Sequence, residues 1–131
     1  MPTIVNPPDM PKSLGAFSRG VVAESGPLLF VSGHTAVDDK GQLVGPGDPA
    51  AQTRQTLENI RRVVEAAGGR VQDIVSVTIY LVDTAHYQAM NEVRRAFFGS
   101  HPPASATVVA KNLVRPGALV EISAVATLRP A

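Results

Sequence analysis

Two stretches of the chain repeat apolar residues at the spacing of an amphipathic helix. The first follows Asp48 and Pro49, which suit an N-cap and a first helical position, and it stops at the glycine pair Gly68-Gly69. The second begins at Asp83 or Thr84 and ends at Gly99. The predicted buried stripes are Leu57, Ile60, Val63, Val64 and Ala67 on the first helix, and Tyr87, Met90, Val93, Ala96 and Phe97 on the second.

Alternation of apolar and polar residues predicts strands around these helices. From Ile74 to Val82, four apolar residues alternate with Ser76, Thr78 and Tyr80, which gives the strand two different faces. Further strands are expected over Ala104 to Ala110 and Leu119 to Leu128. Before the first helix, Ala16 to Ala23 and Leu28 to Val31 flank the turn signal Ser25-Gly26-Pro27 and predict a hairpin. Residues 1–14 hold four prolines and are expected to form an extended arm without a helix.

The predicted order is β-β-α-β-α-β-β, an α+β arrangement in one domain over residues 1–131. Two helices can cover only one face of such a sheet. We therefore expect Ser76, Thr78 and Tyr80, with Ser105 and Thr107 if their strand lies alike, to face a second subunit or a cavity between subunits. The alternative is a solvated antiparallel face, which is common.

Composition narrows the classes of function. The 131 residues carry 12 basic and 11 acidic side chains, so the net charge is +1, and only 18% are charged, below the ~25% of an average domain. Such a chain attracts neither nucleic acid nor a membrane surface strongly, and sparse charge favours an oligomer. No apolar run reaches the ~20 residues of a membrane span, so we expect no anchor and no signal peptide. The absence of cysteine rules out disulfides and thiolate chemistry, and we expect a cytoplasmic protein.

Glu121 is the first candidate for chemistry, because it interrupts the apolar strand Ala118 to Val125. A buried carboxylate there would have a raised pKa and could act as an acid or base. The alternative is a side chain that points to water on the same face as Ser123.

Ser32-Gly33-His34 closes the second predicted strand, where Gly33 permits close backbone approach and its neighbours offer hydrogen bonds. There is no G-x-S-x-G elbow, no ligand spacing among His34, His86 and His101, and no phosphate-binding glycine motif. We therefore predict no metal, no cofactor and no serine hydrolase. The arginine doublets Arg61-Arg62 and Arg94-Arg95 are predicted as solvated helix charges, and Arg115 as a turn residue that either stays on the surface or reaches an anion.

Several segments together resemble the RidA/YjgF family over nearly the full length. They are Gly15-Ala16-Phe17-Ser18, Val31-Ser32-Gly33-His34, the helical stretch 51–60, Asn91 before Ala96-Phe97-Phe98, and Pro103-Ala104-Ser105-Ala106-Thr107 with Val120-Glu121-Ile122. Members are described as enamine/imine deaminases and, in older usage, as endoribonucleases or translation inhibitors. The resemblance implies a chorismate-mutase-like fold and a homotrimer with a central barrel and ligand clefts between subunits.

The resemblance also implies roles for particular residues. Glu121 would orient or activate the water that removes ammonia from an imine or enamine, without a cofactor. The cleft for the small-molecule substrate would be lined by Phe17, Ser32, Gly33, His34, Asn91, Ser105 and Thr107.

The chain departs from the family pattern at Ser105, where the motif Pro-Ala-Arg-Ser has an arginine that binds the substrate carboxylate. Loss of such a charged hydrogen bond typically costs ~1.5–3 kcal/mol. Phe17 and Thr107 also stand where members often have tyrosine and cysteine. Either another cation, such as Arg115 or Lys111, reaches in, or the ligand is different. The sequence therefore predicts a RidA-like deaminase, with a non-catalytic trimeric metabolite-binding protein as the alternative and an endoribonuclease as a weaker one.

Overall fold

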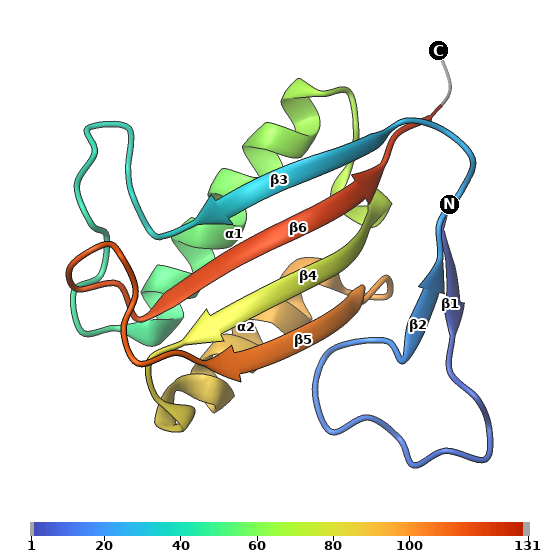
Figure 1. The fold of residues 1–131 in the computed structure, drawn as a ribbon, viewed down its shortest axis with the longest axis horizontal. Coiled ribbons are helices and arrows are strands. Elements are labelled where there is room, and N and C mark those ends of the chain that lie inside the picture. The colour runs from blue at the N-terminus through green and yellow to red at the C-terminus, as the bar shows by residue number, and fades with distance from the viewer. Residues whose placement is uncertain (1, 130–131) are drawn as a thin grey trace.

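A computed structural model describes residues 2–129 (Figure 1). Its strands are β1 (Thr3–Val5), β2 (Gly20–Val22), β3 (Leu28–His34), β4 (Ile74–Leu81), β5 (Ala104–Val109) and β6 (Val120–Thr127). Its helices are α1 (Pro49–Ala66) and α2 (Tyr87–Phe98), and short 3-10 turns at Val71–Asp73 and Thr84–His86 precede β4 and α2. The α+β class is confirmed.

α1 begins and α2 ends where their capping residues predict, whereas α2 begins at Tyr87, one 3-10 turn after the predicted start. The Asp48 side chain accepts a hydrogen bond from the backbone N–H of Ala51 at 3.0 Å, and Pro49 opens α1. Asp83 caps the 3-10 turn before α2 in the same way, through Ala85 at 2.9 Å, and α2 stops at Gly99, whose φ of 58° lies in the left-handed region. Neither helix is long and apolar enough to cross a membrane.

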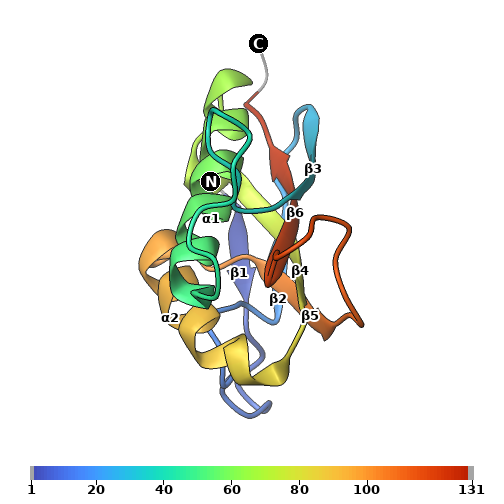
Figure 2. The same ribbon diagram turned by 90° about the vertical axis from the view of Figure 1, so that its left-hand side faces the viewer.

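The main sheet has the strand order β3-β6-β4-β5, in which β4 and β5 are parallel and the other pairs antiparallel. Figure 2 shows α1 and α2 packed on one face of this sheet, with the other face uncovered. The core fills the space between helices and sheet and includes Leu57, Ile60, Met90, Val77, Ile79, Val120 and Ile122. On the open face the side chains are only partly covered, and Phe30 of β3 is 72% exposed. This face is available for contact with another molecule.

The predicted hairpin between residues 16–23 and 28–31 is wrong. β2 pairs instead with β1, with Thr3 opposite Val22 and Val5 opposite Gly20, and β3 pairs with β6. Pro27 explains part of the difference, because its carbonyl accepts from the N–H of Leu128 at 2.8 Å and so starts the pairing of β3 with the far end of the chain. The arm of residues 1–14 thus contains a strand. The small sheet lies beside the start of β5 (Figure 1).

Candidate functional site

A β-bulge shapes the end of β3 where Ser32, Gly33 and His34 lie. Val31 is opposite Ala124 and His34 is opposite Ile122, so β3 carries one residue more than β6 over this step. Such bulges bend a strand and redirect its side chains. Gly33 packs directly on Glu121: a β-carbon at this position would overlap the carboxylate and lie 3.1 Å from its carbon. We call Ser32, Gly33, His34 and Glu121 the Glu121 half-site.

The Glu121 carboxylate is free to act on a ligand. The side chain is half-buried on the open face, where Glu121 is opposite Tyr80 of β4. Within residues 2–129 no hydrogen bond or ion pair engages it. Burial lowers the pKa of His34 by more than the nearby Glu121 raises it, so the imidazole is neutral near pH 7. The half-site therefore places a carboxylate without a hydrogen-bond partner in residues 2–129 beside a neutral imidazole.

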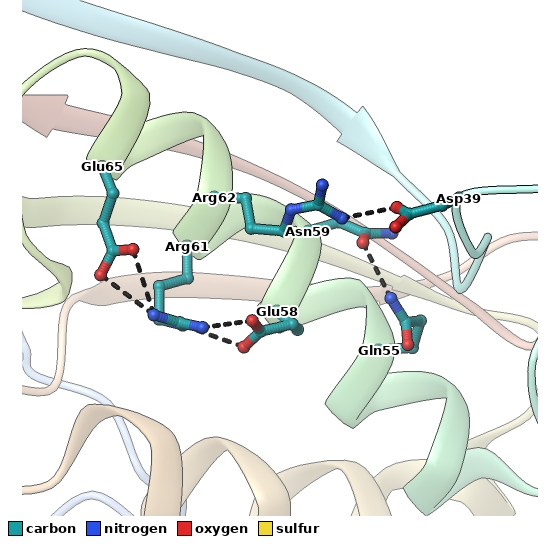
Figure 3. Close-up of polar contacts among 7 residues, drawn as sticks. All are labelled: Asp39, Gln55, Glu58, Asn59, Arg61, Arg62 and Glu65. Carbon is teal, nitrogen blue, oxygen red and sulfur yellow. Dashed lines mark hydrogen bonds and ion pairs between the residues drawn. The ribbon is translucent and has the colours of Figure 1, made fainter.

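Helix α1 holds the loop that follows this half-site (Figure 3). The Asn59 side-chain amide donates to the backbone carbonyls of Thr35 and Val37 at 3.2 and 2.9 Å, and its own oxygen accepts from Gln55 at 2.9 Å. Further along the same face of the helix, Arg62 pairs with Asp39 at 2.7 Å. These contacts fix the chain immediately after His34.

A second cluster lies around Arg94 of α2, at the β5 edge of the sheet. The Arg94 guanidinium donates to the Ser105 hydroxyl at 3.0 Å, to the Tyr87 hydroxyl at 3.1 Å and to the Asn91 side-chain oxygen at 2.7 Å. The rings of Phe17 and Tyr87 lie 5.6 and 5.8 Å from its central carbon, within cation–π range. We call Phe17, Tyr87, Asn91, Arg94 and Ser105 the Arg94 half-site.

The segment before β2 closes over this cluster. Ser18 forms an isolated parallel β-bridge with Ala104 at the start of β5. The N–H of Ala16 donates to the Asn91 side-chain oxygen at 2.8 Å. Gly15 lies so close that a β-carbon there would overlap the Tyr87 hydroxyl and stand 2.9 Å from an Arg94 nitrogen. The absence of a side chain at Gly15 thus lets the segment bring Phe17 to the guanidinium.

Arg94 is a buried positive charge with neutral partners only. Its side chain is 1% exposed, its Nε has no hydrogen-bond partner, and no acidic side chain of residues 2–129 forms an ion pair with it. Burial lowers the pKa of Arg94, yet a guanidinium keeps its proton at any ordinary pH. The structure thus sets a charged group behind Ser105, where the family motif has its arginine.

The prediction that Arg94 is a solvated helix charge is wrong. Met90, Arg94 and Phe98 follow each other at intervals of four, and all three are buried on one face of α2. That spacing is the signal in the sequence that places Arg94 on the buried face. A charged residue in an apolar stripe, however, usually marks the point where the stripe meets solvent. Arg62 and Arg95 are exposed, as predicted, while Arg61 is half-buried and pairs with Glu58 and Glu65. Arg115 donates to the backbone carbonyl of Gly41 at 2.6 Å, and Lys111 is exposed.

The two half-sites do not meet within one chain. Ser105 is opposite Val77 of β4 and therefore lies on the helix-covered face, whereas Glu121 is opposite Tyr80 on the open face. In addition, β4 separates the strands that carry them. Thr107, opposite Ile79, lies on the same face as Ser105. The condition for placing both side chains alongside Ser76 and Thr78, that their strand lies alike, is therefore not met.

One groove on the surface involves neither half-site. A groove of about 780 Å³ lies between α1 and α2 on the outer side of the helices, lined by residues such as Arg54, Glu58, Val93 and Phe97. Across residues 2–129, no three histidine, aspartate or glutamate side chains gather in a way that could hold a metal ion.

Comparison with known proteins shows which family and which solved structures this chain resembles. Residues 8–128 match the family model described as Endoribonuclease L-PSP. A RutC family protein of Pyrococcus horikoshii is 37% identical over 126 residues, which cover 96% of this chain and 98% of the relative. Two solved structures are similar over 97% of the chain. The Rid family protein YyfB of Yersinia pestis, of unknown function, has a TM-score of 0.89, 33% identity and 98% of its own chain covered. The YjgF gene product of E. coli has a TM-score of 0.73 and 33% identity, with 99% of its own chain covered.

The fold and the match over nearly the whole chain define a Rid-type α+β protein. The chain belongs to the Endoribonuclease L-PSP family, which includes the RidA/YjgF and RutC proteins. The resemblance inferred from its sequence motifs is confirmed.

Proposed function

We propose that this protein hydrolyses a reactive imine or enamine, or a related small metabolite, in a cleft between adjacent subunits of a homotrimer. The observation that carries the proposal is the Glu121 carboxylate, which lies against the Gly33 backbone on a β-bulge and has no partner within residues 2–129. A general base must be able to reach a water molecule, and a carboxylate already engaged in an ion pair could not.

In the proposed reaction, Glu121 accepts a proton from water as the water oxygen bonds to the carbon of the C=N group. The nitrogen takes up a proton, so that an amino alcohol forms. Collapse of this intermediate moves the hydroxyl proton to the amino nitrogen, restores a carbonyl, breaks the carbon–nitrogen bond and releases ammonia. Glu121 ends with its original charge, because it passes both protons of the water, one after the other, to the departing nitrogen. The overall change is imine plus water to carbonyl plus ammonia, which needs no cofactor.

The positions of the two half-sites support a cleft between subunits. β3, which carries part of the Glu121 half-site, is one edge of the sheet, and β5, which carries Ser105, is the other. When copies of a chain associate in a closed ring, the edge of one copy meets the opposite edge of the next. In such a trimer, the β3 edge beside the Glu121 half-site of one subunit would adjoin the β5 edge beside the Arg94 half-site of its neighbour.

An imine-trapping assay tests the proposal. An amino-acid oxidase generates imino acids, semicarbazide traps them, and the protein is expected to lower the trapped fraction. Glu121→Gln should reduce this effect at least ~100-fold, while Glu92→Gln, an exposed glutamate on α2, should leave it unchanged. Both variants should elute at about three times 13.7 kDa. Equal activity of Glu121→Gln and the parent, or a monomer in light scattering, would contradict the proposal.

The family description favours one alternative, an endoribonuclease. Incubation of the same two variants with RNA separates the two activities. Cleavage of RNA that disappears in Glu121→Gln, with no effect on imines, would assign the carboxylate to phosphodiester chemistry. Binding of small carbonyl compounds without turnover of either substrate would indicate a metabolite-binding protein.

A further inference from the structure

The buried charge of Arg94 is more than the packing of α2 requires. Its neighbours Met90 and Phe98 fill the same face of the helix with apolar side chains, and a methionine or leucine would fit that stripe. A guanidinium here loses most of its hydration, and its partners within residues 2–129 are a serine, a tyrosine and an asparagine, none of them charged. Uncompensated buried charges are rare in proteins, and they concentrate at sites of function.

The hydrogen bond to Ser105 shows how this charge reaches a ligand. The Ser105 oxygen accepts from Arg94, so the hydroxyl hydrogen of Ser105 remains available as a donor. Ser105 is only half-buried, unlike Arg94, and lies at the edge strand of the sheet. A ligand oxygen bound by this hydroxyl would feel the positive charge directly behind it, and hydrogen bonds in such chains polarise and strengthen one another.

We propose that Arg94, acting through Ser105, supplies the positive charge of an anion subsite, and that the ligand of this site is a small carboxylate. The inference deepens the proposed function, because it names the charge of the compound that is hydrolysed. Arg94 is then a positioning residue: the α2 helix provides the charge that the β5 strand lacks at Ser105. With Glu121 of the neighbouring subunit at the other end, the cleft carries opposite charges at its two ends. The carboxylate of the ligand then binds at the Arg94 end, and its reacting carbon lies at the Glu121 end.

Binding of a matched pair of probes tests the proposal without relying on turnover. 2-Oxobutanoate carries a carboxylate, and 2-butanone has a methyl group in its place. We expect the parent protein to bind the anion at least about tenfold more tightly in NMR titrations, the range of one charge-assisted hydrogen bond. Arg94→Gln should abolish this preference and leave the affinity for 2-butanone unchanged.

Two further variants separate charge recognition from structure. Arg95→Gln removes an exposed charge from the next position of the same helix and should retain the preference for the anion. Arg94→Lys keeps the charge without the planar fork, so it should retain part of the preference. If Arg94→Gln weakens both probes equally, or keeps the preference for the anion, the proposal is overturned.

The outcome is independent of the imine assay. Arg94-dependent binding of 2-oxobutanoate without any imine hydrolysis would support the anion subsite and contradict the deaminase. Glu121-dependent hydrolysis that treats anionic and neutral imines alike, with or without Arg94, would support the deaminase and overturn the anion subsite.

Discussion

The two half-sites of this protein hold opposite charges and are built in opposite ways. The Glu121 half-site lies on the open face of the sheet, where the carboxylate is half-buried and packs against the Gly33 backbone. The Arg94 half-site lies under a covering segment of the chain, where the guanidinium is 1% exposed and donates to three side chains. Both half-sites need a glycine, Gly33 in one and Gly15 in the other, but only the Arg94 half-site has a network of side-chain hydrogen bonds.

The proposed anion subsite would explain how a family site persists when one of its residues changes. Where the family motif has an arginine, this chain has Ser105, and the adjacent helix places a guanidinium against the same position. Since the Arg94 side chain of α2 reaches Ser105 of β5 through a hydrogen bond of 3.0 Å, a charge can be supplied from either element. The comparison leads to three predictions, ordered by the size of the expected effect.

Mixing two inactive variants gives the largest effect. Glu121→Gln and Arg94→Gln each spoil one half-site, so each alone should be nearly inactive towards an anionic imine at low concentration. If the cleft takes one half-site from each of two subunits, every trimer that contains both variants has one cleft in three with both halves intact, so such mixed trimers should recover about a third of the parent activity. Co-expression with two different tags and an assay of the doubly tagged trimers measures this. No recovery would mean that the two half-sites do not share a cleft.

Gly33→Ala breaks the Glu121 half-site without removing its carboxylate. The added methyl overlaps the carboxylate, which must swing away, and a displacement of ~1 Å can cost roughly 100-fold in rate. The free energy of unfolding should change little, because the displaced group is the end of a flexible, half-exposed side chain. Gly20→Ala is the matched control, since its methyl would meet only Val5 atoms at 3.8 Å or more. An active Gly33→Ala protein would show that the position of Glu121 is not critical.

The smallest of the three expected effects is a difference between Arg94→Met and Asn91→Ala in the free energy of unfolding. Asn91→Ala leaves the buried N–H of Ala16 without its acceptor, which should lower the free energy of unfolding by ~1–3 kcal/mol. Arg94→Met removes a desolvated charge, and the half-buried hydroxyls of Ser105 and Tyr87 can turn to water, so stability should stay the same or rise by ~1 kcal/mol. Urea unfolding at one protein concentration compares the two. A loss in Arg94→Met as large as in Asn91→Ala would make Arg94 a residue of the fold.

The sequence alone predicted most of the elements, because their signals are local. Asp48, Pro49 and Gly99 mark helix ends through contacts within a few residues, and the alternation from Ile74 to Leu81 records which side of the strand meets the helices. The family motifs were equally local, so family membership followed from them, and Glu121 became a candidate because it interrupts an apolar strand. The pairing of β2 did not, since a three-residue strand says nothing about which of two partners it will meet.

Only the tertiary structure decided the arrangement of the site. Arg94 reads as a surface charge in the sequence, and it is buried because residues 15–18 fold over it from the other end of the chain. The opposite faces of Ser105 and Glu121 likewise depend on the register of β5 and β6 against β4. Contacts between residues distant in the chain set both outcomes, whereas the sequence pattern reports only the periodicity of each element by itself.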